Sequence, residues 1–388
     1  MKIAYIVETY TEGLGYIDNV LPKWLAKQNN KVDVITAGLP AYYQHKEQSV
    51  VDADLIIGTK IMDKVTVHTV PTIKIANRIL FRKLRSLLSQ LKPDVVIVRG
   101  LASPVLAQVI ISKLTLKYNI ITSTGLAYSA INDQLSSTSL FNWKKAIHFI
   151  SRKVPGYLFS LFIKKCIAST DDCAKAAIEF YGVPKSKTKV ISLGVDTSMF
   201  SPALGLELVQ SRLALRKEMG FEKNDLICIW TGRITKQKGV EILAEAVEQL
   251  NRDDPSIKAL FIGSGSHRHI LDNYTASTVI DFLPWDELPA YYRLADVAVW
   301  PKSLTTSTLD AAACGLPVIM SNRESAVERW NGFGSDYVEG DIESLKKTIL
   351  KFSNSQLRER TKFVAHKIMD DNFSWQVIAS KFYQEISE

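Results

Sequence analysis

Short apolar runs alternate with helical patterns along the whole chain of 388 residues. The runs are rich in Val and Ile without strict alternation of apolar and polar positions, which is typical of strands covered on both faces in a parallel sheet. Helical patterns lie between the runs, for example at 16–27 and 77–91. The first half is expected to hold strands at 2–7, 32–36, 55–58, 65–70, 95–99, 120–123, 166–169 and 189–193.

Residues 197–222 interrupt this rhythm with Pro202, Gly205 and a charged helical stretch, which we interpret as a crossover between domains. The repeated alternation predicts an α/β protein with two doubly wound, Rossmann-like domains, as the chain length also suggests. We expect a first domain at 1–198, a second at 199–370, and a helix at 371–388 that crosses back to the first. The second domain is expected to hold strands at 226–230, 259–263, 279–283, 297–301, 317–321 and 336–338.

The composition argues against several classes of protein. No apolar run reaches 18 residues, so no membrane-spanning helix is predicted, and the first residues are interpreted as a strand rather than a signal peptide. The four cysteines form no CxxC pair, which favours a reducing cytoplasm over a disulfide framework. The six histidines lack metal-site spacing, and Asp52-Ala53-Asp54 is interpreted as a solvated turn, so no metal is expected.

Charge is unevenly distributed. Residues 1–200 contain 26 Lys/Arg and 14 Asp/Glu, a net charge of +12, whereas the remainder has 22 and 26, a net charge of −4. A basic pattern at 75–91, with Arg78, Arg82, Lys83 and Arg85 among Ile and Leu, predicts an amphipathic helix, and 152–165 is chemically similar. We expect peripheral contact with an anionic membrane; a core-packing helix with a solvated basic face is the alternative. Nucleic acid is not expected, because no recognition motif accompanies the charge.

Two glycine-containing loops follow predicted strands. After the first strand, Gly13 and Gly15 form G-x-G without a third glycine, so a dinucleotide fingerprint is incomplete and a plain strand–helix turn is the alternative. In the second half, Gly232-Arg233 follows a strand, and Lys238 precedes a helix five residues after Arg233. Two cations at the end of a strand can bind a diphosphate, because water no longer screens the charge of the diphosphate once it is bound. A solvated basic turn is the alternative.

Further motifs follow these in a set order. They are Phe261-Ile262-Gly263-Ser264-Gly265, Phe282-Leu283-Pro284-Trp285, Tyr291-Tyr292-Arg293-Leu294-Ala295-Asp296, and the segment from Trp300 through Asp310 to Ala311-Ala312-Ala313-Cys314-Gly315. The ordered set resembles the C-terminal domain of the retaining family-4 (group 1) glycosyltransferases of GT-B fold, whose two domains face across a cleft. Val183-Pro184, Gly194-Val195-Asp196 and Phe200-Ser201-Pro202 resemble that family's domain junction, and 15–23 resembles the N-terminal loop of its bacterial surface-polysaccharide members.

The resemblance implies a role for each matching residue. Arg233 and Lys238 would hold the diphosphate of a nucleotide-sugar donor, and Asp310 would hold the ribose hydroxyls. A helix beginning in Thr305, Thr306, Ser307 and Thr308 would direct N–H groups at the phosphate. Gly263, Leu283 and Pro284 would line the nucleobase pocket, and Gly232 would belong to the same donor-binding surface. Gly13 and Gly15 would let the donor phosphates approach the first domain.

The implied reaction is transfer of a sugar, with retention of anomeric configuration, to a glycan or lipid-linked acceptor in surface-polysaccharide or glycoconjugate biosynthesis. The donor would be a UDP-sugar, with a GDP-sugar as the alternative, and neither a cofactor nor a metal is implied.

Two departures from the family pattern stand out. The family's E-x7-E motif has Lys302 at its first acid and the shorter Asp310 at its second, and no histidine follows the strand at 120–123. Tyr128 or Asp133 is the expected replacement at the acceptor site, since the nearest histidine, His148, is expected on a helix surface. The departures leave a second hypothesis open, a catalytically degenerate GT-B subunit that binds a partner or glycan. A sugar-nucleotide epimerase and a dinucleotide oxidoreductase are less well supported, because acid–histidine clusters and a complete G-x-G-x-x-G are missing from the sequence.

Overall fold

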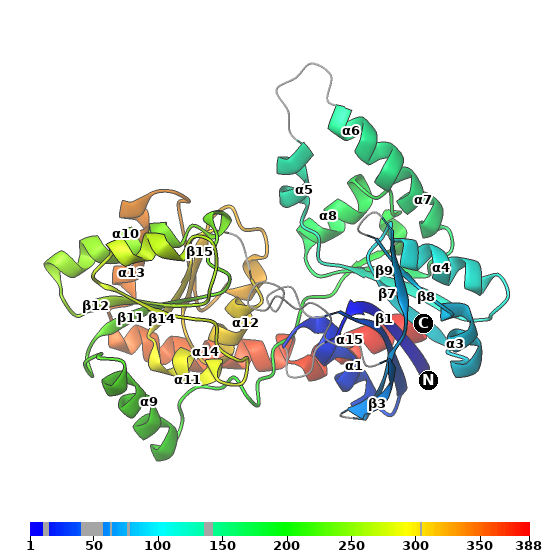
Figure 1. Ribbon diagram of the computed structural model, residues 1–388. Helices are drawn as coiled ribbons and strands as arrows, with labels where there is room; N and C mark the ends of the chain where they lie inside the picture. The colour runs from blue at the N-terminus through cyan, green and yellow to red at the C-terminus, as the bar shows by residue number, and fades with distance from the viewer. Residues whose placement is uncertain (11–14, 40–56, 63, 76–77, 136–142, 303–304) are drawn as a thin grey trace. The chain divides into compact units, whose positions relative to one another are not determined.

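The computed structural model describes residues 1–10, 15–39, 57–62, 64–75, 78–135, 143–302 and 305–388. The chain divides into two compact units, each with a largely parallel sheet of its own (Figure 1). The first unit comprises Met1–Leu193 and Ile378–Glu388, and the second comprises Gly194–Val377. No helix in these described ranges is long and apolar enough to cross a membrane.

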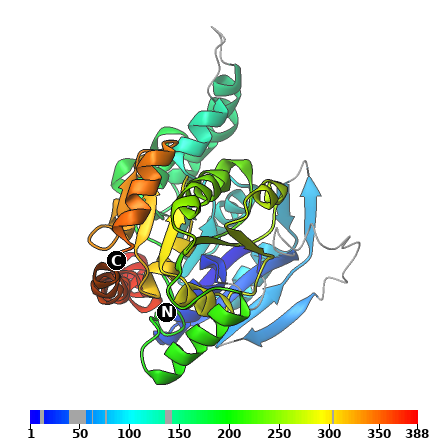
Figure 2. The same ribbon diagram turned by 90° about the vertical axis from the view of Figure 1, so that its left-hand side faces the viewer.

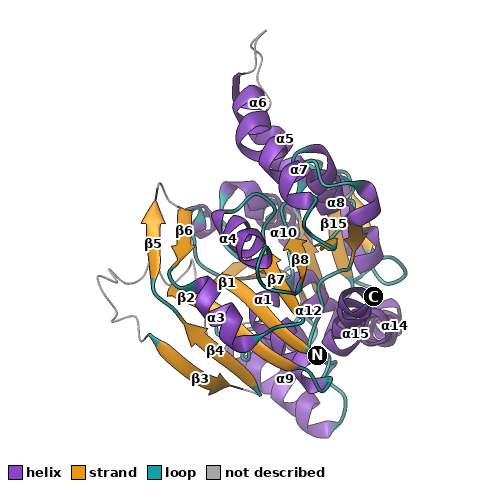
Figure 3. Cartoon of the chain, turned by 90° about the vertical axis from the view of Figure 1, so that its right-hand side faces the viewer, coloured by secondary structure: helices purple, strands orange, loops and turns teal. Residues whose placement is uncertain are grey.

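The sheet of the first unit has the strand order β10-β9-β8-β7-β1-β2-β4-β3 within the described residues (Figure 3). Every neighbouring pair is parallel except β3 with β4. Its central strands are apolar and buried because helices cover both faces of the sheet. The strands are β1 (Lys2–Thr9), β2 (Lys31–Leu39), β3 (Gly58–Met62), β4 (Val65–Thr69), β7 (Val95–Arg99), β8 (Asn119–Thr124), β9 (Lys165–Ala168) and β10 (Thr188–Val190).

The helices of the first unit connect these strands. On one face of the sheet, α3, α4 and α8 share a buried core with Ala4, Ile6, Val96 and Val98. The helical elements are α1 (Ile17–Lys27), α3 (Leu84–Leu91), α4 (Pro104–Lys113), α5 (Tyr128–Leu135), α6 (Trp143–His148), the π-helical η1 (Phe149–Lys153), α7 (Val154–Ser160), α8 (Asp171–Glu179) and η2 (Lys185–Lys187). The last helix of the chain, α15 (Trp375–Ser387), lies in the first unit from Ile378 onward.

The predicted amphipathic helix at 77–91 is wrong in its first half. Instead, β5 (Thr72–Ile75) and β6 (Arg78–Phe81) form a two-stranded antiparallel sheet, and α3 begins only at Leu84. In β6 the buried Ile79 and Phe81 alternate with half-buried residues, a period of two that a helix cannot satisfy. The backbone of Phe81 exchanges two hydrogen bonds with the side chain of Gln108, at 3.0 and 2.9 Å.

The sheet of the second unit is entirely parallel within the described residues, with the order β13-β12-β11-β14-β15-β16. Helices α10 and α13 pack together on one side of it, and α12 packs against α14 on the other (Figures 1 and 2). The strands are β11 (Leu226–Thr231), β12 (Ile257–Ile262), β13 (Ser277–Ile280), β14 (Val297–Trp300), β15 (Val318–Ser321) and β16 (Ser335–Tyr337). The helical elements are α9 (Leu206–Glu218), η3 (Lys236–Lys238), α10 (Val240–Asp253), η4 (Arg268–Asn273), α11 (Leu288–Leu294), α12 (Ser307–Ala313), η5 (Val327–Arg329), α13 (Ile342–Lys351) and α14 (Ser355–Phe373).

The charged stretch within 197–222 is part of the second unit, where α9 packs against α11. The buried Arg216 of α9 forms an ion pair with Asp296, just before β14. Arg212 donates to the same carboxylate at 3.0 Å, and so does the backbone N–H of Ile227, also at 3.0 Å. This network ties α9 to the amino-terminal edge of the second sheet.

We predict that Asp296→Ala lowers the free energy of unfolding by about 3–5 kcal/mol, because it leaves the buried Arg216 without its counter-charge. The exposed Asp253 at the end of α10 provides the matched control, and Asp253→Ala should change stability by less than about 0.5 kcal/mol. Urea unfolding followed by circular dichroism measures both. Equal stabilities of the two variants would contradict a structural role for the pair.

Candidate functional site

The candidate site lies at the carboxyl-terminal edge of the second sheet. After β11 the chain adds β12 and β13 on one side and then β14 on the other, so the strand order reverses between β11 and β14. Open α/β sheets bind ligands outside the carboxyl ends of their strands at such a reversal. Most of the predicted donor residues lie directly after the strands at this edge. Gly232 and Arg233 follow β11, Gly263 follows β12, and Leu283 and Pro284 follow β13; Thr305 and Thr306 lie after β14, before Ser307 and Thr308 at the start of α12.

The loops after β11 and β12 touch through glycine. Gly263 has φ of 144°, and a Cβ built on it would lie 1.8 Å from the carbonyl oxygen of Gly232. A Cβ on Gly265 would lie 2.1 Å from the carbonyl oxygen of Ile234. The loop after β13 joins them, because the N–H of Phe282 donates to Ser264 Oγ at 3.2 Å. Three consecutive loops thus form one connected surface, and glycine is required at their contacts.

Arg233 and Lys238 lie close enough to influence each other. Arg233 is exposed and Lys238 is half-buried at the end of η3, directly before α10. Burial lowers the pKa of Lys238, the positive charge of Arg233 lowers it further, and Glu324, beyond β15, acts in the opposite direction. A bound anion would relieve both the burial cost and the repulsion, so this cation pair is preorganised for a negatively charged ligand.

Tyr292 of α11 is a structural residue of this edge to which the sequence analysis gave no role. Its buried hydroxyl lies 2.6 Å from Oγ1 of Thr231, at the end of β11, and also interacts with Ser307 at the start of α12. Trp300 Nε1 donates to the carbonyl oxygen of Thr231 at 3.1 Å. Burial raises the pKa of Tyr292, so it stays a neutral hydrogen-bonding group that holds α12 beside β11.

The threonine-rich loop contains an unsatisfied polar atom. Thr308 Oγ1 donates to the carbonyl oxygen of Thr305 at 2.8 Å, which closes the turn before α12. The hydroxyl of Thr305 itself is buried and has no hydrogen-bond partner among the residues that the structure describes. A buried hydroxyl without a partner costs about 1–3 kcal/mol, and a ligand oxygen at this position would satisfy it.

Asp310 lies in the first turn of α12 and is buried. Burial, with a smaller contribution from the negative charge of Asp196, raises its pKa to about 8. The carboxyl group is therefore mostly protonated at neutral pH, when it can both donate and accept a hydrogen bond. A protonated carboxyl group can form hydrogen bonds with a pair of neutral hydroxyls.

Lys302, which occupies the position of the family's first acid, also belongs to this edge. It follows β14 by two residues, and a Cβ on Gly239 would lie 3.0 Å from Lys302 Cδ. Its aliphatic stem therefore covers the Gly239 cap of α10, next to Lys238. The site thus has three neighbouring cationic residues after β11 and β14.

The first unit has a comparable reversal of strand order, between β1 and β7. Gly15 lies in the loop after β1, whereas Gly13 lies outside the described residues, so the roles of both stay predictions. Arg99 at the end of β7 forms an ion pair with Asp18 of α1 at 3.2 Å, and the buried Tyr5 hydroxyl donates to the same carboxylate at 2.9 Å.

The sequence analysis missed the Tyr5–Asp18–Arg99 cluster. Arg99 Nη2 lies 3.9 Å from a Cβ built on Gly125, in the loop after β8, so the guanidinium reaches the carboxyl-terminal edge of the first sheet. The signal in the sequence is an arginine that ends a buried apolar strand and precedes a glycine, Gly100, which has φ of 97°.

The two acceptor candidates, Tyr128 and Asp133, belong to α5 of the first unit. Tyr128, the first residue of α5, stacks on Phe180 with ring centroids 4.8 Å apart, and Lys175 Nζ lies 4.0 Å from the centre of its ring. Asp133 is in α5, but its side chain lies outside the described residues. His148 is half-buried against the rings of Phe180 and Tyr181 rather than on a free helix surface.

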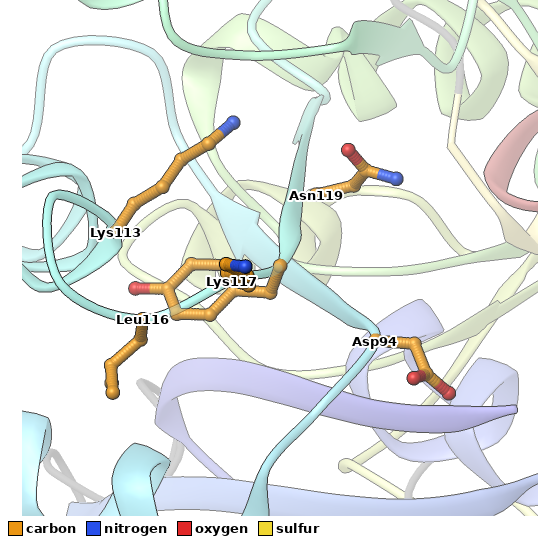
Figure 4. Close-up of a pocket in the computed structure, with 6 residues that line it drawn as sticks. Asp94, Lys113, Leu116, Lys117 and Asn119 are labelled. Carbon is orange, nitrogen blue, oxygen red and sulfur yellow. The ribbon is translucent and has the colours of Figure 1, made fainter.

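Two pockets lie at the amino-terminal edges of the two sheets, one in each unit. A pocket of about 490 Å³ in the first unit is lined by Asp94, before β7, and Asn119, at the start of β8 (Figure 4). A pocket of about 460 Å³ in the second unit lies beside the Arg212–Asp296 pair. Neither is lined by any predicted site residue that the structure describes, and the described ranges contain no group of three or more metal-ligating side chains.

Comparison with known proteins identifies the fold and the family of this chain. The chain is similar to a structure of Anabaena Alr3699/HepE in complex with UDP and glucose, with a TM-score of 0.72, 16% sequence identity and coverage of 100% of this chain and 99% of that one. A glycosyltransferase from Rickettsia africae gives a TM-score of 0.71 at 16% identity, over 100% of this chain and 98% of that one. The predicted GT-B fold is confirmed.

Residues 21–199 match the family described as Glycosyltransferase Family 4, and residues 211–367 match the one described as Glycosyl transferases group 1. The chain belongs to the family-4, group 1 glycosyltransferases. It is 29% identical over 216 residues to spore coat protein SA of Bacillus subtilis, a match that covers 50% of this chain and 57% of that protein. It is 29% identical over 174 residues to a D-inositol 3-phosphate glycosyltransferase of Geodermatophilus obscurus, covering 40% of this chain. The matches thus span 57% and 37% of the lengths of these two relatives.

We predict that Asp310 makes the protein less stable as the pH rises from about 4 to 8. The folded protein keeps a proton on Asp310 up to a pKa of about 8, whereas the unfolded chain releases it near its ordinary value of 3.8, so folding binds a proton between these two values. Its stabilising contribution is complete below pH 4 and is lost as the pH passes 8. The effect is on the order of a few kcal/mol.

Asp310→Asn, which imitates the protonated acid, should remove this part of the pH dependence and unfold at a higher urea concentration than wild type at pH 9. Urea midpoints at pH 6 and pH 9 test the prediction. A variant with the wild-type pH dependence would show that Asp310 is already ionised when folded.

Proposed function

We propose that the protein is a retaining glycosyltransferase that moves a sugar from a nucleotide-diphosphate sugar to a glycan or a lipid-linked acceptor. The second unit would bind the donor, and the first unit would bind the acceptor. The acceptor's place in surface-polysaccharide or glycoconjugate biosynthesis is part of the proposal. Membership of the family supports the reaction type, and the organisation of the second unit supports the donor.

The observation that carries the proposal is the Arg233–Lys238 pair at the strand-order reversal. The two cations affect each other electrostatically, Lys238 is half-buried, and the connected glycine loops lie beside them. Burial and the positive charge of Arg233 disfavour the charged form of Lys238, and Glu324 favours it. A diphosphate would add negative charge beside the two cations and leave a surface between the glycine loops for the rest of the nucleotide.

The same arrangement suits the chemistry of transfer. When the bond between the sugar and the diphosphate breaks, negative charge develops on the leaving oxygen, and fixed cations stabilise it without having to reorganise. The unsatisfied hydroxyl of Thr305 and the N–H groups at the start of α12 would add hydrogen bonds to a phosphate. Asp310, protonated near neutral pH, would bind the two ribose hydroxyls rather than act as a charged base.

The proposed retention of configuration needs no strong protein base. The departing phosphate can take the proton of the acceptor when the acceptor approaches on the face that the leaving group vacates. This route is compatible with the absence of a histidine after the strand at 120–123 in the sequence. Tyr128, Asp133 and the newly identified Arg99 are the candidates for contact with the acceptor.

A UDP-sugar is the proposed donor, with a GDP-sugar as the alternative. Similarity in fold to a protein solved with UDP and glucose supports a uridine nucleotide. Lys302, which replaces an acid that usually faces the sugar, leaves the identity of the sugar open. We place the protein in the cytoplasm, at the inner face of a membrane; the four buried, unpaired cysteines are compatible with a reducing compartment.

We predict that the wild-type protein binds UDP more tightly than GDP or ADP in metal-free buffer, and that Arg233→Ala and Lys238→Ala each weaken binding at least tenfold. The physical reason is the loss of one charged contact to the diphosphate, which is worth about 1.5–3 kcal/mol. Removal of one such group should also slow sugar transfer by about 10²–10³-fold. Calorimetry measures the binding, and turnover with a screened UDP-sugar measures the rate.

Arg252→Ala is the matched control, because it removes one positive charge at the opposite end of α10 from Lys238. It should leave nucleotide affinity within about twofold of wild type. If a folded wild-type protein binds none of the three nucleotides, the transferase proposal fails and the degenerate binding subunit becomes the better hypothesis.

A further inference from the structure

An exposed apolar stripe runs along one helical rod of the first unit. Helices α6 and α7 are joined without interruption by η1, so residues 143–160 form one rod about 27 Å long at 1.5 Å per residue. Figures 1 and 3 both show this rod projecting away from the sheet of the first unit. The rod and the residue after it carry an exposed row of Trp143, Ile147, Ile150, Val154, Tyr157, Leu158 and Leu161, with exposed fractions from 40% to 71%.

The spacing of the stripe shows that it is one face of the rod. Its members follow one another at intervals of three or four residues, apart from the adjacent Tyr157 and Leu158, so they lie within a single angular sector. Phe149 is 53% exposed outside this sector, and two other residues away from the stripe contact the rest of the unit. His148 packs on Phe180 and Tyr181, and a Cβ on Gly156 would lie 2.2 Å from the carbonyl oxygen of Tyr181. One side of the rod therefore packs against the unit, and the apolar stripe points away from the core.

The charges around the stripe indicate what covers it. Residues 134–170 contain no Asp or Glu, whereas 143–165 contain six Lys or Arg residues. Lys145 is exposed on the rod, and Arg152, Lys153 and Lys164 are half-buried beside it. An apolar stripe with aromatic residues, on a segment whose charged side chains are all cationic, fits the interface of an anionic bilayer, where the apolar side chains enter the acyl boundary and the cations meet phosphates.

We infer that this rod is the surface by which the protein lies on an anionic membrane, with the stripe from Trp143 to Leu161 inserted at the headgroup boundary. Trp143 and Tyr157 suit that depth, because each joins an apolar ring to a polar atom. The rod would rest in the interface rather than cross it. The inference rests on the proposed function, because membrane contact would bring the enzyme to a lipid-linked acceptor. It also replaces the segment at 75–91 as the membrane-contacting element.

The test is co-sedimentation with vesicles in the absence of nucleotide. Wild type should bind vesicles of equal parts phosphatidylglycerol and phosphatidylcholine, and should bind pure phosphatidylcholine at least about tenfold more weakly. The double variant Ile150→Asp/Leu158→Asp places two carboxylates on the stripe and should reduce partitioning onto the anionic vesicles at least about tenfold. Both side chains are exposed, so the fold should tolerate the change.

The control double variant Leu114→Asp/Leu206→Asp makes the same change of charge outside the stripe, at side chains that are 72% and 74% exposed. It should bind vesicles within about twofold of wild type. Failure of wild type to bind anionic vesicles would overturn the inference, as would equal binding by the stripe and control variants. A wild-type dimer that the stripe variant converts to a monomer, without vesicle binding, would assign the stripe to a second copy of the chain. Calorimetry with UDP should give the same affinity for wild type and the stripe variant, which separates membrane contact from the donor site.

Discussion

The proposed donor site depends on the reversal of strand order in the second sheet. Because the chain places β12 and β13 on one side of β11 and then β14 on the other, the loops after β11 and β14 diverge at the carboxyl ends of their strands. The cations after β11 and the threonine loop after β14 thereby flank the same position. Tyr292 secures this arrangement, since its hydroxyl joins Thr231 at the end of one strand to Ser307 at the start of α12.

Several groups at this edge are unfavourable for folding and suited to a ligand. The hydroxyl of Thr305 is buried without a partner in the described part of the chain. The pKa of Asp310 is raised by burial, and the pKa of Lys238 is lowered by burial and by Arg233. The apolar strands and the Arg216–Asp296 pair at the opposite edge stabilise the unit that holds these groups. Titratable groups whose pKa values are shifted by burial and by neighbouring charges cluster at functional sites.

The sequence predicted the strands more reliably than the side-chain clusters. Apolar runs such as those of β1, β11 and β14 identified buried parallel strands, and their alternation with helices predicted two doubly wound domains. The GT-B fold was implied by the resemblance of the ordered motifs to the family. The helix expected at 77–91 failed because a period-two stretch, Arg78–Phe81, also fits a helical pattern over so few residues. The Tyr5–Asp18–Arg99 cluster and the role of Tyr292 could not be predicted, because they join residues from separate elements. The exposure of the α6–α7 stripe likewise depends on which face of the rod packs against Phe180 and Tyr181.

Hydrogen–deuterium exchange with and without UDP tests the central claim most directly, because it locates the nucleotide without any substitution. A donor site at the carboxyl-terminal edge predicts that UDP slows exchange in the loops at 231–239, 263–265 and 282–287 and in the first turn of α12. Exchange around Arg212 and Lys362, beside the pocket at the opposite edge, should remain unchanged. Slower exchange confined to that opposite edge would contradict the account.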